Sequence, residues 1–378
     1  MTGFQSSKPQ SKVISVFVAF NFRDYQGPKA KGLAYSLLKV TDNAFSFNYC
    51  CSRERTKHKW TAFSAGEFQN AILSTGHHYK APLSVFVATA TGEQGRPLSI
   101  LLLQLGYKVQ TLVRDPSSSG AQALRVLRAE VHTGNLGSFE AVAGAISGAD
   151  TLYLAFPPNL KNEILYAENV LEAAQQEKVT QVIYSSVART GDHETFPDWS
   201  KEYPSAQYWI QKDEIEKMIR TLGFNFWTIL RPAFFMQNFC YPKCNHMFPG
   251  LSETHTLRIA FLPSTRLDLI SVGDIARFAT KSIQPPNRFS KKTLTLAAEK
   301  LSAAGIADQL GAVSGKNITV EYLPDQVARA LRKQGNGVVG AQIWQRDVCY
   351  NVDIDALSEY GVYLTPMTEA LSKESLNW

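Results

Sequence analysis

Tyr208 and Lys212 stand four residues apart in a stretch that is expected to form a helix. Residues at this spacing share one face of a helix, so the phenol and the ammonium would be neighbours. A free phenol has a pKa of about 10, and a nearby ammonium stabilises the phenolate and lowers that pKa toward neutrality. The pair therefore predicts proton transfer by Tyr208 to a carbonyl group. The structural alternative is that Tyr208 packs in the core and Lys212 pairs with Glu216.

A second set of residues has the spacing of a dinucleotide-binding turn. The stretch TATGEQG lies between an apolar strand pattern and a helical pattern. In such turns, glycines let the backbone approach a pyrophosphate, and the next helix directs its N-terminal N–H groups at the negative charge. We therefore predict a cofactor turn made by Thr89, Gly92, Glu93, Gln94 and Gly95.

Thr89 occupies the first position of this turn, where a glycine is expected. A β-branched residue restricts the backbone and adds bulk in a tight turn. Its effect depends on whether the position needs a positive φ or a very close backbone approach. We expect weakened rather than abolished cofactor binding.

The ends of the following strands indicate which dinucleotide binds. A carboxylate after the second strand would favour NAD, but this strand ends in Arg114. A guanidinium takes a 2′-phosphate in bidentate fashion, which predicts NADP(H); a surface arginine is the alternative. Asn135 would meet the adenine edge and Lys212 the nicotinamide ribose. Ser185 or Ser186, after the fifth strand, would orient the substrate oxygen.

Strand and helix patterns alternate strictly over the region that carries these residues. Buried strands are expected at residues 83–89, 107–114, 129–134, 150–156, 179–186 and 224–232. Helices are expected between them, at 94–106, 121–128, 138–148, 161–178 and 206–223. Short connections in such an alternation require a parallel sheet with helices on both faces. The predicted fold class is α/β, with a Rossmann-type doubly wound parallel sheet.

Three parts of the chain are expected. Residues 1–82 form a basic, weakly structured extension, 83–231 an NADP-binding Rossmann domain, and 232–378 a smaller substrate-side lobe with some strands returning to the main sheet. The stretch RPAFFMQNF, residues 231–239, would either roof an apolar substrate pocket or pack between the lobes. The long loop after the fifth strand is expected to shape or cover the site.

The 378-residue chain has a formal net charge of +6, but the excess lies in the extension. Residues 1–82 hold eleven Lys and Arg against four Asp and Glu, and the remainder is almost neutral. Broad binding of nucleic acid by the core is therefore not expected, whereas the extension could touch an acidic partner. Cys240, Cys244 and His246 lack the spacing of a usual zinc site, so no metal is predicted.

The sequence also bears on location. No run of eighteen apolar residues occurs, so no membrane span is expected. No secretory signal is recognised, which favours reduced thiols and a cytoplasmic or nuclear location. A transit peptide stays an alternative, because residues 1–22 hold Lys and Ser but no acid.

Five stretches together resemble the NmrA-like branch of the atypical short-chain dehydrogenases/reductases: TATGEQG, GYKVQTLVRDP, VIYSSVA, YWIQKDEIEKMIR and ILRPAFFMQNF. The similarity runs from about residue 83 to about residue 365. It implies a Rossmann fold that binds NADP(H). Some relatives reduce small molecules, including in fungal secondary metabolism, and others are redox sensors that bind regulatory proteins. The family commonly has Gly at the position of Thr89 and often Asp at that of Asn135, and it often keeps the lysine while varying the tyrosine.

The leading prediction is an NADPH-dependent oxidoreductase that reduces a small, fairly apolar molecule, with Tyr208 as the proton donor. The alternative is a non-catalytic NADP(H)-sensing regulatory protein that binds a protein partner. A third interpretation is a relative that has lost its cofactor and binds nothing, for which Thr89 is the main support.

Overall fold

The computed structural model describes the chain in two compact units, Met1–Ala81 and Pro82–Trp378. In the first unit it describes the backbone of three strands, which pair antiparallel in the order β1–β2–β3. Their bounds are Ile14–Phe20, Ala34–Thr41 and Ala44–Cys51. In the second unit it describes residues 83–156, 161–203, 205–284 and 286–378. The sequence analysis expected weak structure before residue 83 and did not identify these three strands; the rest of that prediction lies outside the described residues.

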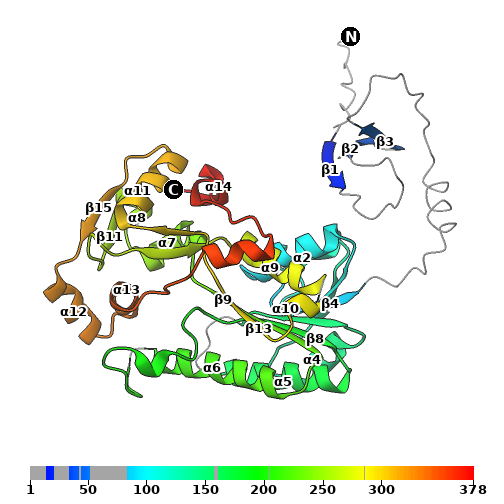
Figure 1. Ribbon diagram of the computed structural model, residues 1–378, viewed down its shortest axis with the longest axis horizontal. Helices are drawn as coiled ribbons and strands as arrows, with labels where there is room; N and C mark the ends of the chain where they lie inside the picture. Colours follow the sequence, from blue (N-terminus) through cyan, green and yellow to red (C-terminus); the bar gives the residue numbers. More distant parts are fainter. Residues whose placement is uncertain are drawn as a thin grey trace, which may run out of the picture. The chain divides into compact units, whose positions relative to one another are not determined.

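A seven-stranded parallel sheet forms the centre of the second unit (Figure 1). Its order is β13–β9–β8–β7–β4–β5–β6. The strands are β4 (Ser84–Val87), β5 (Lys108–Val113), β6 (Glu130–Thr133), β7 (Thr151–Leu154), β8 (Gln181–Ser185), β9 (Phe226–Pro232) and β13 (Lys292–Leu296). The strand order reverses beside β4, because β5 and β6 lie on one side of it and β7 to β9 on the other. In doubly wound sheets, ligands bind at this reversal, outside the carboxyl ends of the strands.

Helices cover both faces of this sheet, as Figure 1 shows. One face carries α4 (Phe139–Ile146), α5 (Glu163–Gln176) and α6 (Ala206–Thr221). The other carries α2 (Gly95–Gln104), α3 (Ser119–Val126), α9 (Val272–Ile283) and α10 (Pro286–Phe289). Successive side chains of a strand point to opposite faces, and both faces of β4 are apolar: Val85 and Val87 pack with α2, and Phe86 packs with α4 and α5. The predicted fold class and every element predicted from residue 83 to residue 232 are confirmed.

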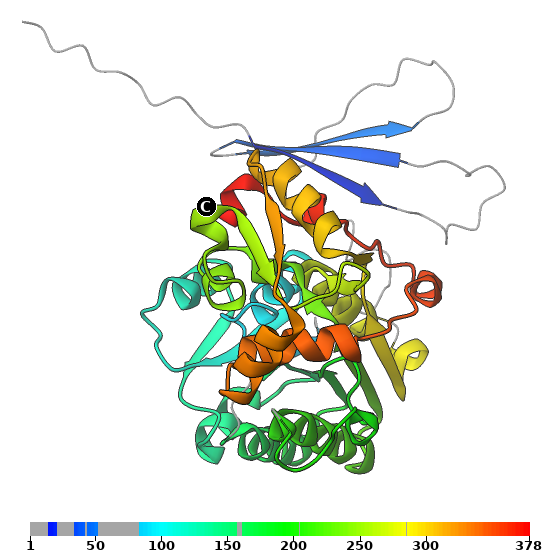
Figure 2. The ribbon, with the colours of Figure 1, turned by 90° about the vertical axis from the view of Figure 1, so that its left-hand side faces the viewer.

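The remaining elements form a smaller lobe. A three-stranded sheet has the order β10–β12–β14, and β11 pairs in parallel with β15. These strands are Phe234–Phe235, Leu267–Ile270, Glu299–Leu301, Thr256–Ile259 and Thr319–Tyr322, in that order. The helices are α7 (Lys243–Met247), α8 (Leu251–Thr254), α11 (Ala303–Ser314), α12 (Asp325–Lys333), α13 (Gly337–Asp347), α14 (Met367–Ala370) and α15 (Lys373–Leu376). Helices α12 and α13, in orange, lie side by side (Figures 1 and 2).

Residues after position 232 also return to the main sheet. Strand β13 pairs with β9, and α9 packs against α2. The sheet therefore draws on both sides of the predicted boundary at residue 231. None of the helices in the described part of the chain combines the length and the hydropathy needed to cross a bilayer.

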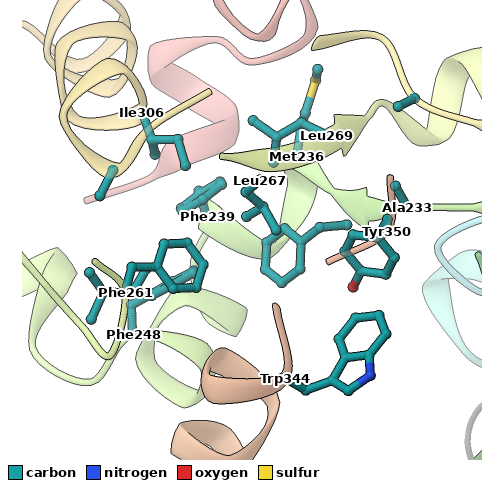
Figure 3. Packing of buried hydrophobic residues seen from close by; sticks show 14 of the residues in the cluster. Ala233, Met236, Phe239, Phe248, Phe261, Leu267, Leu269, Ile306, Trp344 and Tyr350 are labelled. Atoms are coloured by element: carbon teal, nitrogen blue, oxygen red, sulfur yellow. The ribbon is translucent and has the colours of Figure 1, made fainter. Parts of the chain in front are cut away.

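Aromatic side chains fill the interior of the smaller lobe. Met236 and Phe239 are fully buried, and the rings of Phe239 and Phe248 stack with their centres 4.8 Å apart. Figure 3 shows these three side chains packed beside Leu267 and Leu269. The stretch RPAFFMQNF thus contributes to a closed core, which favours packing over a pocket roof.

Candidate active site

The glycine-rich turn joins β4 to α2. The Gly92 N–H donates to the Thr89 carbonyl at 2.8 Å, and the Arg96 N–H donates to the Gly92 carbonyl at 2.9 Å. A Cβ placed on Gly95 would lie 2.1 Å from the Thr89 carbonyl oxygen, far inside van der Waals contact. A Cβ on Gly92 would lie 3.1 Å from the same atom. The helix therefore begins directly against the end of β4, and the position of Gly95 admits no side chain.

Thr89 is accommodated without backbone strain. Its φ is not positive, so a β-branched residue can adopt the local conformation. Its Oγ1 donates to the carbonyl of Ala155, the residue after β7, at 2.8 Å. This bond joins the ends of β4 and β7 at the reversal of strand order. The reduced cofactor affinity expected from Thr89 stays a prediction.

Gln94 connects the start of α2 to two strands through hydrogen bonds. Its Oε1 accepts hydrogen bonds from the Ser185 hydroxyl at 2.6 Å and from the Tyr153 hydroxyl at 3.3 Å. The Ser186 hydroxyl lies 3.1 Å from the Thr190 hydroxyl. Both serines expected to orient a substrate oxygen are therefore hydrogen-bonded to protein groups, and Ser185 also holds the turn; their role toward a substrate stays a prediction.

Glu93 forms an ion pair with Lys243 of α7, in the smaller lobe. Both side chains keep some access to water, with 26% and 44% exposed. Glu93 lies one residue before the N-cap of α2, close to the helix N-terminus where a bound phosphate would also be drawn. Lys243 moderates the repulsion that this carboxylate would exert on a phosphate. The sequence analysis named Glu93 and missed Lys243, because no local pattern connects residues so far apart.

The two residues expected near the adenosine lie on exposed turns. Arg114 follows β5, and its guanidinium makes no hydrogen bond or ion pair within the described residues. The Asp115 carboxylate accepts bonds from the Ser117 hydroxyl at 2.6 Å and N–H at 2.8 Å, which hold its pKa below the ordinary value. Asn135 accepts a bond from the Gly137 N–H at 2.9 Å. Arg114 is thus available for a phosphate, while its neighbouring carboxylate is engaged.

Tyr208 and Lys212 do share one face of α6. The Lys212 Nζ lies 5.8 Å from the centre of the Tyr208 ring and 5.6 Å from that of Tyr184. Its ion-pair partner is Glu163, the first residue of α5, at 2.6 Å. The alternative pairing with Glu216 is not formed.

Glu216 is held elsewhere. Its carboxylate accepts two bonds from Arg231, at 2.9 and 2.7 Å, and one from Arg220 at 2.7 Å. Because this carboxylate is fully buried, the two guanidiniums compensate its charge. This cluster links α6 to β9 and leaves Lys212 to Glu163.

Burial raises the pKa of Tyr208, with further upward contributions from Tyr350 and the Glu163 carboxylate. The sequence analysis expected Lys212 to lower this pKa, and that expectation is wrong. The main physical reason is burial of the phenol, which disfavours the phenolate, and Glu163 adds to it because its negative charge opposes that of the ammonium. The Tyr208 hydroxyl is therefore protonated across the physiological range.

An aromatic cluster surrounds this tyrosine. The Tyr208 and Trp209 rings meet edge to face with centres 5.3 Å apart, and Trp209 packs against Trp344 at 4.9 Å. Trp344 in turn packs against Tyr350 at 5.1 Å, and Figure 3 shows these two residues together. The Rossmann part thus presents Tyr208 to the aromatic interior of the smaller lobe.

Cys240 and Cys244 are free thiols, and burial raises the pKa of both. In the part of the chain that the structure describes, no group of three His, Cys, Asp or Glu side chains has the geometry of a metal site.

The reversal of strand order and the glycine-rich turn define a Rossmann-type α/β protein. The model of the NmrA-like family matches residues 83–352, which is most of the chain. The protein belongs to the NmrA-like family.

Two fungal proteins are similar in sequence. The NmrA-like family domain-containing oxidoreductase ptmS of Penicillium ochrochloron is 26% identical over 170 residues, covering 42% of this chain and 49% of that protein. Agroclavine dehydrogenase of Claviceps fusiformis is 32% identical over 112 residues, covering 29% of this chain and 37% of that protein. The chain thus spans about half or less of the length of these curated relatives.

Two solved structures illustrate the fold. The NADPH-dependent quinone oxidoreductase QOR2 of Escherichia coli, complexed with NADPH, has a TM-score of 0.60 at 20% identity, covering 78% of this chain and 98% of that one. NmrA, a negative transcriptional regulator in complex with NAD, has a TM-score of 0.60 at 17% identity, covering 77% and 90%. At these identities the likeness shows the fold.

Proposed function

We propose that the protein is an NADPH-dependent oxidoreductase that reduces a small, fairly apolar molecule. The observation that carries the proposal is the turn at Gly95, where the backbone of α2 approaches β4 too closely for any side chain. Such an approach leaves the N-terminus of a helix open to a pyrophosphate at the reversal of strand order. The fungal relatives named oxidoreductase and dehydrogenase support a redox reaction.

Arg114 supports the choice of NADPH over NADH. It is exposed and without a protein partner among the described residues, as a site for a 2′-phosphate requires. The adjacent carboxylate of Asp115 is occupied by Ser117 and is poorly placed to bind ribose hydroxyls as well. The similarity in fold to QOR2, which was solved in complex with NADPH, supports this choice.

When bound, NADPH supplies the hydride. Tyr208 would donate a proton to the substrate oxygen; its phenol is protonated, although burial raises its pKa and makes it a weaker acid than a free tyrosine. Lys212 would hold the nicotinamide ribose. The aromatic residues that adjoin Tyr208, among them Trp209 and Tyr350, favour an apolar substrate.

Titration of the full chain with NADPH, NADH and NADP⁺, followed by fluorescence or calorimetry, tests the cofactor site. We expect NADPH to bind more tightly than NADH. A screen of apolar carbonyl compounds and quinones for NADPH oxidation then tests the reaction. We expect Tyr208→Phe to abolish turnover and keep NADPH affinity. Failure of the wild-type protein to bind millimolar NADPH would overturn the proposal, and unchanged turnover in Tyr208→Phe would remove Tyr208 as the acid.

A second candidate is an NADP(H)-sensing regulatory protein that binds a protein partner. One observation favours it: Lys212 is paired with Glu163, and the pKa of Tyr208 is raised, so the pair is not tuned for rapid proton transfer at neutral pH. This candidate predicts cofactor binding without turnover, and an affinity for a protein partner that differs between NADPH and NADP⁺. Equal partner affinity with both cofactors would count against it.

A further inference from the structure

The ion pair between Lys212 and Glu163 is deeply buried. The two side chains are 4% and 0% exposed, and Nζ lies 2.6 Å from the carboxylate Oε1. Removing both charges from water is costly, and well-packed apolar residues of similar volume usually give equal or greater stability. Stability alone therefore does not account for this pair.

Its position in the fold points to the cofactor site. Glu163 begins the helix that follows β7, so it lies at the carboxyl edge of the sheet, where ligands bind. Lys212 faces Tyr184 near the end of β8. The next residue along β8, Ser185, contacts Gln94 in the glycine-rich turn. One strand end thus touches both the predicted pyrophosphate turn and the buried ion pair.

Three elements present titratable groups to the Lys212 ammonium. Helix α5 provides Glu163, β8 provides Tyr184, and α6 itself provides Tyr208. Burial raises the pKa of both phenols, which are therefore neutral. Glu216 acts on Tyr184 from α6, but two arginines already hold its carboxylate. Within the described residues, Glu163 is the carboxylate that pairs with Lys212.

We propose that Glu163 is a positioning residue of the cofactor site, whose carboxylate keeps the Lys212 ammonium charged and in place to bind the nicotinamide ribose. The inference rests on the proposed function and deepens it. Without the carboxylate, the ammonium would face two neutral rings with little access to water, and desolvation would favour the neutral amine. Glu163 acts through Lys212 and is not itself assigned a contact with the cofactor.

NADPH affinity as a function of pH separates this role from a purely structural one. We expect the wild-type dissociation constant to vary little between about pH 7 and about pH 9.5, because Glu163 stays paired with Lys212 in the interior. In Glu163→Gln the buried amine has no counter-charge, so desolvation favours its neutral form and the ribose contact weakens as the pH rises. The dissociation constant should then increase about tenfold or more across the range, since a lysine bound to the ribose is lost.

Glu172→Gln is the matched control. It makes the same change on the same helix, at an exposed carboxylate that contacts Gln176 and not Lys212. We expect it to keep the wild-type pH profile. Lys212→Met, which has no ammonium to lose, should bind NADPH weakly at every pH.

Glu163→Gln leaves an unpaired charge in the interior, which can prevent folding. Two further variants test the inference in that case. Glu163→Asp retains the charge on a shorter side chain and is expected to weaken NADPH binding about threefold or more without a pH trend. The double variant Glu163→Gln/Lys212→Met removes both charges and should recover part of the urea midpoint lost in Glu163→Gln. Wild-type NADPH affinity in the double variant would overturn the inference, because neither the ammonium nor its carboxylate would then contribute to binding.

The outcomes also distinguish the inference from the function on which it rests. A wild-type protein that fails to bind NADPH overturns the proposed function and the role of Lys212 with it. A wild-type protein that binds NADPH, together with a Glu163→Gln variant that keeps the wild-type affinity and pH profile, overturns the inference alone.

Discussion

Replacing Gly95 by alanine tests the central geometric feature of the candidate site. The new Cβ would lie 2.1 Å from the carbonyl oxygen of Thr89, 2.6 Å from its carbonyl carbon and 2.9 Å from the Cα of Ala90. All three are backbone atoms, so no rotation of a side chain can relieve the contact. The substitution therefore requires α2 to move away from the end of β4.

The size of the effect follows from these distances. Ordinary contacts of a Cβ begin near 3.4 Å, so the separation from the Thr89 oxygen must grow by more than about 1 Å. Insertion of a methyl group into a packed site costs about 1–3 kcal/mol, and a contact with backbone alone belongs at the upper end of this range. The same shift would misalign the N–H groups at the start of α2. Loss of one or two charge-assisted hydrogen bonds to a phosphate would weaken NADPH binding about ten- to hundred-fold or more.

Gly144→Ala provides the matched control. Gly144 lies within α4 and is exposed, and outside the backbone of its own helix and its chain neighbours no atom lies within 4 Å of the position that a Cβ would occupy. Alanine is favoured over glycine inside a helix by about 1 kcal/mol, so this variant should be slightly more stable than the wild type. The same substitution is therefore expected to lower the free energy of unfolding at position 95 and to raise it at position 144. Gly92→Ala, with a contact of 3.1 Å, should fall between them.

Urea denaturation gives the stability of each variant, and NADPH titration gives the affinity. We expect Gly95→Ala to lose both stability and NADPH affinity, and Gly144→Ala to gain stability and keep the wild-type affinity. A Gly95→Ala variant with wild-type stability and affinity would refute the reasoning, because the close approach of α2 to β4 would then not exist in solution. If Gly95→Ala lost stability but kept the wild-type NADPH affinity, the turn would not be part of the cofactor site.

Three further predictions follow from individual contacts. Arg114→Ala should weaken NADPH binding about ten- to hundred-fold and leave NADH binding unchanged, because a bidentate charge-assisted contact contributes about 1.5–3 kcal/mol; titration with both cofactors checks this. Thr89→Val should lower the free energy of unfolding by about 1 kcal/mol through loss of the bond to the Ala155 carbonyl, and equal urea midpoints would contradict that bond. Glu216→Gln should cost about 3 kcal/mol in the same assay, because the guanidinium of Arg231 loses its buried carboxylate partner.

Most of the fold was predictable from local patterns. Strands such as β4 and β8 are continuous apolar runs, because both of their faces are buried, and the helices between them carry clear start and stop signals. Pro97 in the first turn of α2 and Gly106 just after its end are examples, and Gly106 has the positive φ that favours glycine. The return of β13 to the main sheet was expected in outline, but its place beside β9 is a long-range pairing that no local pattern specifies.

The site was predictable only where the backbone or a helical spacing determines it. Gly95 and the shared face of Tyr208 and Lys212 are of this kind. Glu163 was not identified as the partner of Lys212, because the two residues belong to different helices, whereas Glu216 has the favourable spacing on α6. The direction of the Tyr208 pKa was wrong for the same reason: burial and the charge of Glu163 are properties of the packed structure.

The contacts of the glycine-rich turn explain how a threonine can stand where the family commonly has glycine. Thr89 is bonded to the end of β7, Gln94 to β7 and β8, and Glu93 to α7 in the smaller lobe. The polar side chains of the turn that contact the protein therefore reach β7, β8 and the smaller lobe. A turn held by these hydrogen bonds does not need the conformational freedom of an extra glycine. The conformational entropy of the turn is lost when the protein folds, so little more is lost when a ligand binds.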